Sequence, residues 1–202
     1  MGQAGMAEAA VRYLRSAAAA PLARPVEALP RPELRCVGQN ERAPVDPTEF
    51  RRVLGTFATG VTVVTAPATE PGGSPAGFAC QSFSSLSLDP PLIAFMVGRT
   101  STTWPRIARA GVFCVNVLSA GQGELCRAFA VRGADKFAGV DHTPAPASGS
   151  PRLTGTLAWI DCTIHAVHTG GDHLIVVGRV DALGTGDDED ARPLLFHKGR
   201  FL

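Results

Sequence analysis

Two long runs of strand-forming residues, separated by a turn with two glycines, constrain the fold of this chain more than any other feature. The runs extend over about residues 156–168 and 173–183 and are rich in β-branched and aliphatic side chains. Thr169-Gly170-Gly171-Asp172 lies between them, and its glycines can adopt the positive φ angles that a tight hairpin turn requires. The pattern therefore predicts a long antiparallel β-hairpin.

Shorter elements accompany this hairpin along the chain. Further strands are predicted near residues 61–65, 76–83, 92–97, 112–118 and 193–202. Helix starts are predicted at Asp46-Pro47, at Ser101-Thr102-Thr103-Trp104-Pro105, and at Ser119, which forms a capping box with Gln122. Many strands and few helices predict a mainly β fold, a closed barrel with a few helical insertions. Strand–helix alternation is incomplete and no GxGxxG occurs, so a doubly wound parallel sheet is not expected.

Composition divides the chain near residue 45. Residues 1–44 are rich in Ala, Pro and Arg and are interpreted as a mobile N-terminal extension, with a short helix over roughly Gln3–Ala20. Residues 45–202 are predicted to form one domain. The formal net charge is +1, from 19 basic and 18 acidic residues, so charge does not indicate a nucleic acid or a membrane as partner.

The cysteines and the apolar runs further limit the class of protein that this chain can belong to. The most apolar run, residues 91–97, is far shorter than the roughly 20 residues of a membrane-spanning helix. Five scattered cysteines form no CxxC pair, which indicates neither a disulfide framework nor a zinc site, so no metal is predicted. Cys114 and Cys162 lie in strand patterns and are expected to be core residues. A reducing compartment, the cytoplasm, is the predicted location.

A serine-rich stretch, residues 77–92, is the first candidate binding segment. It contains four serines, a glutamine and a cysteine directly before the apolar strand at 92–97. Small side chains let backbone N–H groups approach a ligand, and hydroxyls add donors, so the stretch suits a flat ligand with a phosphate tail. An ordinary serine-rich loop ended by Pro90-Pro91 is the alternative.

A second candidate follows that strand. Residues 97–104 place a glycine, Arg99 and four hydroxyl groups at the start of a helix, which predicts an anion site. A helix cap with a solvated arginine is the alternative.

His173 begins a strand directly after the Gly-Gly-Asp turn, and it could project from the barrel rim into a site. A surface histidine is the alternative, as is a metal site shared with His165 and His168, which no carboxylate or cysteine spacing supports. Asp135-Lys136-Phe137, with Arg127, is a weaker candidate for contacts with a phosphate and a ring. No GxSxG occurs, so hydrolysis is not indicated.

Taken together, these segments resemble the flavin reductase-like family, the small reductase components of two-component flavin-dependent monooxygenases. The resemblance is collinear over about residues 48–201, and several segments are most similar to the subgroup that serves the secosteroid phenol hydroxylase. The matching segments are Phe57–Thr65, Gly77–Phe83, Ser85–Leu92, Phe113–Leu118, Asp135–Gly139, Leu157–Cys162, Gly171–His173, Gly178–Val180 and Pro193–Phe196.

The resemblance implies an FMN-binding split β-barrel of Greek-key type that forms a homodimer, with flavin near the subunit interface. It implies reduction of FMN or FAD by NADH or NADPH, with reduced flavin supplied to a partner monooxygenase. A non-enzymatic flavin carrier is the alternative from another class. A barrel that binds PLP or F420 is a third, less favoured alternative, because the motifs fit flavin reductases better.

The resemblance also implies roles for individual residues. His173 would lie beside the nicotinamide as the catalytic residue. Residues 80–83 would contact the isoalloxazine and ribityl groups, and Arg99, Ser101 and Thr102 would contact the phosphate. The full predicted cofactor-binding set is Ala79, Cys80, Gln81, Ser82, Phe83, Ser85, Val97, Gly98, Arg99, Thr100, Ser101, Thr102, Thr103, Trp104, Asn116, Arg127, Lys136, Phe137, Gly171 and Asp172. Many relatives carry Thr-Ala-Asn-Ser at positions 79–82, so the hydrogen bonds at the flavin edge are expected to differ here.

Overall fold

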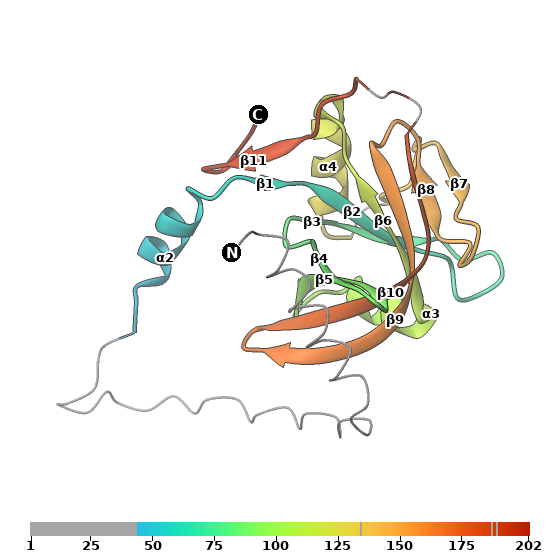
Figure 1. Ribbon diagram of the computed structural model, residues 1–202, viewed down its shortest axis with the longest axis horizontal. Helices are drawn as coiled ribbons and strands as arrows, with labels where there is room; N and C mark the ends of the chain where they lie inside the picture. The colour runs from blue at the N-terminus through green and yellow to red at the C-terminus, as the bar shows by residue number, and fades with distance from the viewer. Residues whose placement is uncertain (1–43, 134, 187, 189) are drawn as a thin grey trace, which may run out of the picture. The chain divides into compact units, whose positions relative to one another are not determined.

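The computed structural model describes residues 44–202 except 134, 187 and 189. The predicted helix at 3–20 and the N-terminal extension lie outside the described residues. The described part is mainly β, as predicted, and antiparallel throughout its large sheet (Figure 1). None of the helices within it has the length and apolar character needed to cross a membrane.

The chain forms twelve strands and four helical segments in the described part. The helical segments are α2 (Pro47–Leu54), α3 (Trp104–Ala110), the short 3-10 helix η1 (Ala120–Gln122) and α4 (Gly123–Ala130). The strands are β1 (Thr59–Gly60), β2 (Thr62–Ala66), β3 (Ala76–Cys80), β4 (Ser84–Leu88), β5 (Pro91–Gly98), β6 (Val112–Val117), β7 (His142–Pro144), β8 (Pro151–Leu153), β9 (Ala158–Gly170), β10 (His173–Thr185), β11 (Leu195–His197) and β12 (Arg200–Phe201).

Seven strands form one sheet in the order β3-β2-β6-β9-β10-β5-β4. Its two edge strands, β3 and β4, are consecutive in the chain and are joined by only residues 81–83. A link of this length reaches about 14 Å, whereas the edges of a flat seven-stranded sheet lie about 29 Å apart. The sheet must therefore roll up until the joined ends of its edge strands lie within this reach, as the predicted barrel requires.

Ser82 fastens the link between the two edge strands to β5, the neighbour of β4. Its hydroxyl accepts a hydrogen bond from the Met96 N–H at 2.8 Å and donates to the Met96 carbonyl at 3.0 Å. Met96 lies on β5, so this side chain takes the place of a backbone partner where β3 has ended. We call this contact the seam.

The long hairpin predicted from the sequence is confirmed as β9 and β10, thirteen residues each (Figure 1). Gly171 in its turn has φ +67°, the positive value that the glycine pattern predicts. β10 pairs with β9 on one side and with β5 on the other, so the hairpin tip lies beside the end of β5.

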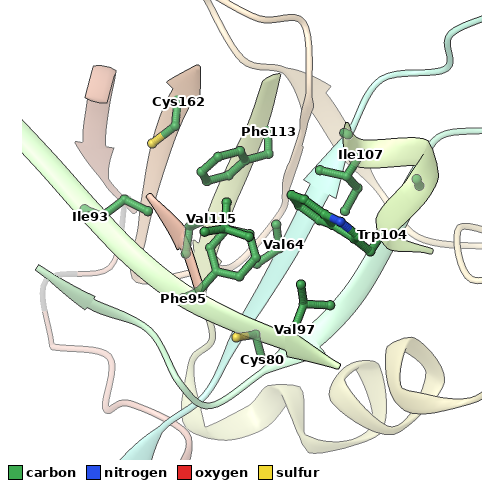
Figure 2. Packing of buried hydrophobic residues seen from close by; sticks show 13 residues of the cluster. Val64, Cys80, Ile93, Phe95, Val97, Trp104, Ile107, Phe113, Val115 and Cys162 are labelled. Carbon is green, nitrogen blue, oxygen red and sulfur yellow. The ribbon is translucent and has the colours of Figure 1, made fainter. Parts of the chain in front are cut away.

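Aromatic side chains fill the centre of the rolled sheet. Phe95 packs edge-to-face against Phe113, with ring centroids 5.2 Å apart, and against Trp104 at 6.3 Å (Figure 2). A Cβ at Gly178 would lie 2.4 Å from the Phe113 ring, so this position of β10 must remain glycine for the ring to fit. Cys162 lies in the same core, and Cys114 is also fully buried, as predicted for both.

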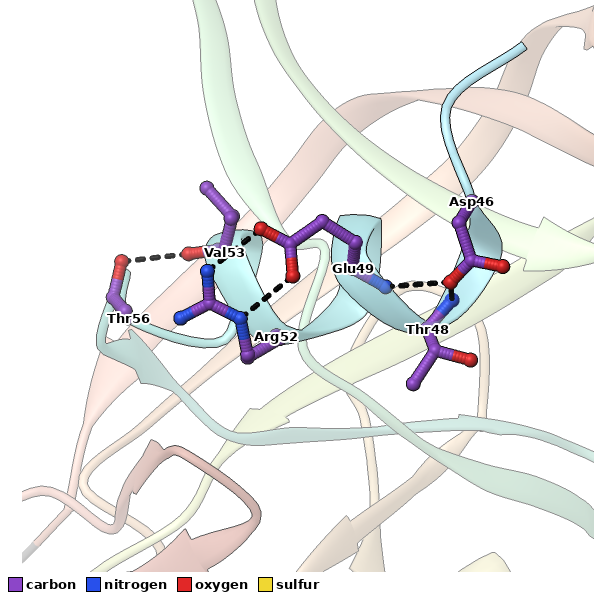
Figure 3. Close-up of polar contacts among 6 residues, drawn as sticks. All are labelled: Asp46, Thr48, Glu49, Arg52, Val53 and Thr56. Carbon is purple, nitrogen blue, oxygen red and sulfur yellow. Dashed lines mark hydrogen bonds and ion pairs between the residues drawn. The ribbon is translucent and has the colours of Figure 1, made fainter.

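The helix α2 begins where the sequence predicts. The Asp46 carboxylate accepts hydrogen bonds from the N–H groups of Thr48 and Glu49, at 2.8 and 3.0 Å, and Glu49 pairs with Arg52 (Figure 3). Within the described residues, the apolar side of this helix is not buried: Phe50, Val53 and Leu54 are about half exposed.

Four strands depart from the predicted pattern. The serine-rich stretch contains a strand, β4, because its backbone pairs with β5 although Ser84 and Ser85 are exposed. The segment predicted as one strand over 76–83 ends at Cys80, since the chain then crosses to the other sheet edge. Residues 142–153, predicted as a loop up to Pro151, contain a small hairpin, β7–β8, whose three-residue strands are too short to leave a pattern.

Candidate functional site

Three of the predicted segments meet at the carboxyl end of β5. Ser82 bonds to Met96 of this strand, as described, and Gly98 is the cross-strand partner of His173. The Arg99 N–H donates to the Asp172 carbonyl at 3.0 Å. The structure therefore brings the serine-rich junction and the loop after β5 together with the Gly-Asp-His turn, which lies far from both in the sequence.

His173 is held at this strand end by its neighbour. Its Nδ1 lies 2.7 Å from the Asp172 Oδ1, which assigns Nδ1 as the protonated donor and leaves Nε2 free to meet a ligand. A Cβ built on Gly98 would lie 3.9 Å from Nε2, so the imidazole extends over this glycine. The hydrogen bond with His173, together with that residue's charge, lowers the pKa of Asp172. The His173 side chain is half exposed, so a ligand can reach it.

A cleft of about 370 Å³ opens near the same strand end, between β3, α3 and the loop before Phe137. We call it the Lys136 cleft. Its lining combines two basic side chains, three hydroxyl groups and one carboxylate. The lining residues are Ser74, Pro75, Gly77, Thr102, Thr103, Arg106, Gly133, Asp135, Lys136 and Phe137.

Backbone carbonyls, which carry no net charge, hold both cations of the cleft. Lys136 donates to the carbonyls of Phe129 at 2.9 Å and Gly77 at 3.1 Å, and Arg106 donates to the carbonyls of Ser74 and Pro75. No carboxylate forms an ion pair with either cation within the described residues. Burial, and then the charge of Arg106, lower the pKa of Lys136. The cleft thus presents two cations outside any ion pair of the described residues against the single carboxylate of Asp135, an excess of positive charge that suits a phosphate.

Gly77 forms the floor of this cleft. A Cβ at this position would lie 2.6 Å from the Phe129 ring and 3.3 Å from the Phe137 ring. These two rings pack edge-to-face with centroids 5.1 Å apart, and Phe129 is fully buried. The absent side chain therefore lets the aromatic pair lie against β3, next to the Gly77 carbonyl that binds Lys136.

Several predicted contact residues occupy the same region. Gln81 is exposed between the sheet edges, and its N–H has no backbone partner within the described residues. Gly98, Arg99 and Thr100 lie at the accessible end of β5, and the Ser101 hydroxyl accepts from the Trp104 N–H. Ala79 and Phe83 are partly buried on either side of the link between the sheet edges.

Other predicted contact residues lie away from this region or already make contacts within the chain. Val97 and Trp104 are buried in the aromatic core, and Ser85 is exposed on the outer strand β4. Cys80 is buried, which raises the pKa of its thiol. Arg127 pairs with Glu124 on the surface of α4 and covers the ring of Phe201.

Asn116 departs most from its predicted place. It is fully buried and uses its whole amide within the chain. The nitrogen lies 3.2 Å from the Val63 carbonyl, 3.2 Å from the Thr65 hydroxyl and 3.3 Å from the Pro151 carbonyl. The oxygen accepts from the Leu153 N–H at 2.8 Å. The amide therefore fastens β8 to the sheet, and the structure does not bring it to the cleft.

The site also contains residues that the sequence analysis did not select. Arg106 lies on α3, two residues past the predicted anion loop, and the helical prediction for this segment would have placed it one turn from Thr103. Ser74 comes from the Pro/Gly-rich loop before β3, where no pattern pointed to it. No group of three potential metal ligands occurs among the residues that the structure describes.

Comparison with known proteins identifies the class of this fold and site. A family model described as "Flavin reductase like domain" matches residues 54–202. This chain belongs to the flavin reductase-like family. The predicted family is thereby confirmed, and with it the predicted class of activity, flavin reduction.

Individual relatives cover most of the described chain. The flavin-dependent monooxygenase, reductase subunit HsaB, of Rhodococcus jostii is 52% identical over 157 residues, 78% of this chain and 77% of that protein. The crystal structure of a nitrilotriacetate monooxygenase component B homologue from Mycobacterium thermoresistibile has a TM-score of 0.74 at 48% identity, covering 78% of this chain and 86% of that one. The Streptomyces globisporus NADH:FAD oxidoreductase SgcE6, solved with NAD and FAD fragments, has a TM-score of 0.72 at 38% identity, covering 80% and 96%.

Proposed function

We propose that this chain catalyses the reduction of FAD by NADH and supplies the reduced flavin to a separate flavin-dependent monooxygenase. The observation that carries the proposal is the Lys136 cleft, with its two un-neutralised cations, close to the strand end that presents His173. The choice of NADH and FAD is supported by relatives named NADH-dependent FAD reductase and NADH:FAD oxidoreductase.

The residues present fit a phosphorylated flavin. Lys136 has already used two of its three N–H donors on carbonyls, which fixes the third, and Thr102 and Thr103 add hydroxyl donors from the opposite wall. The free N–H of Gln81 and the small residues around the seam offer a flat, polar-edged surface for the ring system. A phosphate in the cleft would also raise the pKa of Lys136 and keep it protonated.

His173 would position the second substrate. With Nδ1 donating to Asp172, the free Nε2 accepts a hydrogen bond, for which the carboxamide of a nicotinamide is a suitable donor. Bound flavin would supply the chemistry, since its ring accepts a hydride from a reduced nicotinamide stacked on it. The chain itself aligns the two rings and provides no nucleophile.

A homodimer is part of the proposal. Large apolar side chains are exposed on α2 (Phe50, Val53 and Leu54), on the edge strand β4 (Leu86 and Leu88) and on its neighbour β5 (Met96). A monomeric protein rarely leaves this many large apolar side chains in water. Burial of this surface against a second copy is expected, and Leu54→Glu combined with Leu88→Glu should convert the dimer to monomers in sedimentation experiments.

The cytoplasm remains the proposed location. The four cysteines in the described part, Cys80, Cys114, Cys126 and Cys162, are free and buried, which suits a reducing compartment. A monooxygenase partner is supported by the relatives named as reductase subunits of flavin-dependent monooxygenases.

Loss of NADH absorbance on adding FAD or FMN tests the proposed activity, with NADPH in a parallel series. We expect turnover with NADH and FAD, and His173→Ala should raise the KM for NADH while leaving the Kd for FAD unchanged. The exposed loop residue Arg192, replaced by alanine, serves as the matched control. Binding of FAD without any NADH oxidation would instead favour the flavin carrier.

A further inference from the structure

A second hollow continues the Lys136 cleft beyond Arg106. It measures about 220 Å³ and shares Ser74 and Arg106 with that cleft, so the two form one groove along α3. We call this part the Arg109 groove. Its lining residues are Pro67, Ala68, Thr69, Glu70, Gly73, Ser74, Arg106 and Arg109.

The wall of this groove opposite α3 is an ordered turn. The Gly73 N–H donates to the Glu70 carbonyl at 3.0 Å, and Gly72 has φ +74°, which closes the turn without strain. Arg106 donates to the carbonyls of Ser74 and Pro75 and thereby ties the same loop to α3. The groove is therefore built between two segments that are fastened to each other.

Arg109 gives the groove its charge. It follows Arg106 by three residues on α3, so both side chains lie on the same face of the helix. Neither arginine forms an ion pair within the part of the chain that the structure describes. With Lys136, three cations follow one another along a continuous hollow, more than a single phosphate needs.

FMN and FAD differ only beyond this first phosphate. FMN ends there, whereas FAD continues through a second phosphate into adenosine. Building on the function proposed above, we propose that the Arg109 groove binds the adenosine half of FAD and makes this chain prefer FAD to FMN. Arg106, at the junction, faces the second phosphate, and Arg109 faces the adenosine.

The other lining residues suit that half of the ligand. An arginine guanidinium stacks on planar rings, and Pro67 and Ala68 offer an apolar surface opposite Arg109 for an adenine. The hydroxyl of Thr69 and the carboxylate of Glu70 are partners for the hydroxyl groups of a ribose. Riboflavin phosphate alone would leave all of these groups in water.

Binding of FAD and of FMN to the full-length protein, measured separately by flavin fluorescence, tests the assignment with Arg109→Ala. Because the guanidinium that stacks on the adenine is lost, the Kd for FAD should rise by about tenfold, whereas the Kd for FMN should stay within about twofold. Arg109 is exposed on α3, so its removal leaves the core intact. Arg192→Ala is the matched control, and Arg109→Glu should weaken FAD binding further.

NADH also carries an adenosine diphosphate group, so the KM for NADH is measured with FMN as the acceptor. An unchanged KM in Arg109→Ala supports the assignment to FAD. A raised KM with an unchanged ratio of FAD to FMN affinity would assign the groove to the nicotinamide cofactor and overturn our proposal. Equal loss of FAD and FMN affinity would overturn it too, while a wild-type protein that binds neither flavin would refute the proposed function itself.

Discussion

Replacing Asn116 by alanine separates a structural role from a ligand-binding role for this side chain. The amide is fully buried and has four hydrogen-bond partners, all on β2 or in the β8 segment. Alanine removes all of them and leaves the Leu153 N–H without a partner in a dry environment. The resemblance to the family, by contrast, assigns Asn116 to the flavin pocket.

The loss of stability in Asn116→Ala follows from the number of polar groups left without a hydrogen-bond partner. One buried donor without a partner costs about 1–3 kcal/mol, and the cavity left by the amide adds to this. We expect the free energy of unfolding to fall by about 3 kcal/mol, out of the roughly 5–15 kcal/mol typical of such domains. With a urea m-value of about 2 kcal/mol/M, the midpoint should move down by about 1.5 M.

Urea unfolding and FAD titration of the same preparation provide the assay. The midpoint should shift while the Kd for FAD, measured without urea, stays within about twofold of wild type. Thr65→Val is the matched variant, because it removes another member of the same network and should also destabilise without affecting FAD. A tenfold loss of FAD affinity at an unchanged midpoint would refute the structural reasoning and restore the predicted contact.

Three further changes follow from the site. Gly77→Ala brings a Cβ within 2.6 Å of the buried Phe129 ring, so we expect a loss of about 1–3 kcal/mol in thermal unfolding; an unchanged Tm would contradict the packing argument. Burial keeps the pKa of Lys136 below its usual 10.5. The ammonium is therefore lost, and FAD affinity falls, as pH rises through that lowered pKa. The variant Lys136→Met should bind FAD weakly at every pH, and an alkaline decline in FAD affinity that persists in this variant would exclude Lys136 as its cause. Asp172→Ala frees the His173 ring and should raise the KM for NADH with little change in FAD binding, whereas equal effects on both would point to a general disturbance of the turn.

The fold was predictable where a residue type has one conformational use. The glycines of the β9–β10 turn and the Asp46 cap are of this kind, since a turn with positive φ favours glycine and a helix N-cap favours aspartate. β4 was not predictable, because exposed serines on an outer strand read as a loop until the pairing with β5 is known. Strands are predicted from the alternation of buried and exposed side chains, and an edge strand whose side chains are mostly exposed shows little of this alternation.

The site was predictable only in part for a related reason. The strand Val112–Val117 is largely buried on both faces, so no alternation of polar and apolar residues indicates which way Asn116 points. The contribution of Arg106 depends on which loop lies against α3, and that contact joins residues about thirty positions apart. The segments that form the site could be predicted from the sequence. Which residues of each segment line the cleft and which only hold the fold together could be read only from the tertiary structure.

The three-residue link between β3 and β4 has a consequence for folding. Ser82 bonds to β5 from within the link that closes the barrel, near the Gly98 partner of His173, so closure of the barrel and formation of this surface are coupled. An intermediate with all its hairpins formed but with Ser82 still detached from Met96 would have no place for a flavin ring. Amide protons of Met96 and its neighbours should therefore exchange more slowly once ligand is added, since a molecule lying across that junction holds shut the last part of the barrel to close.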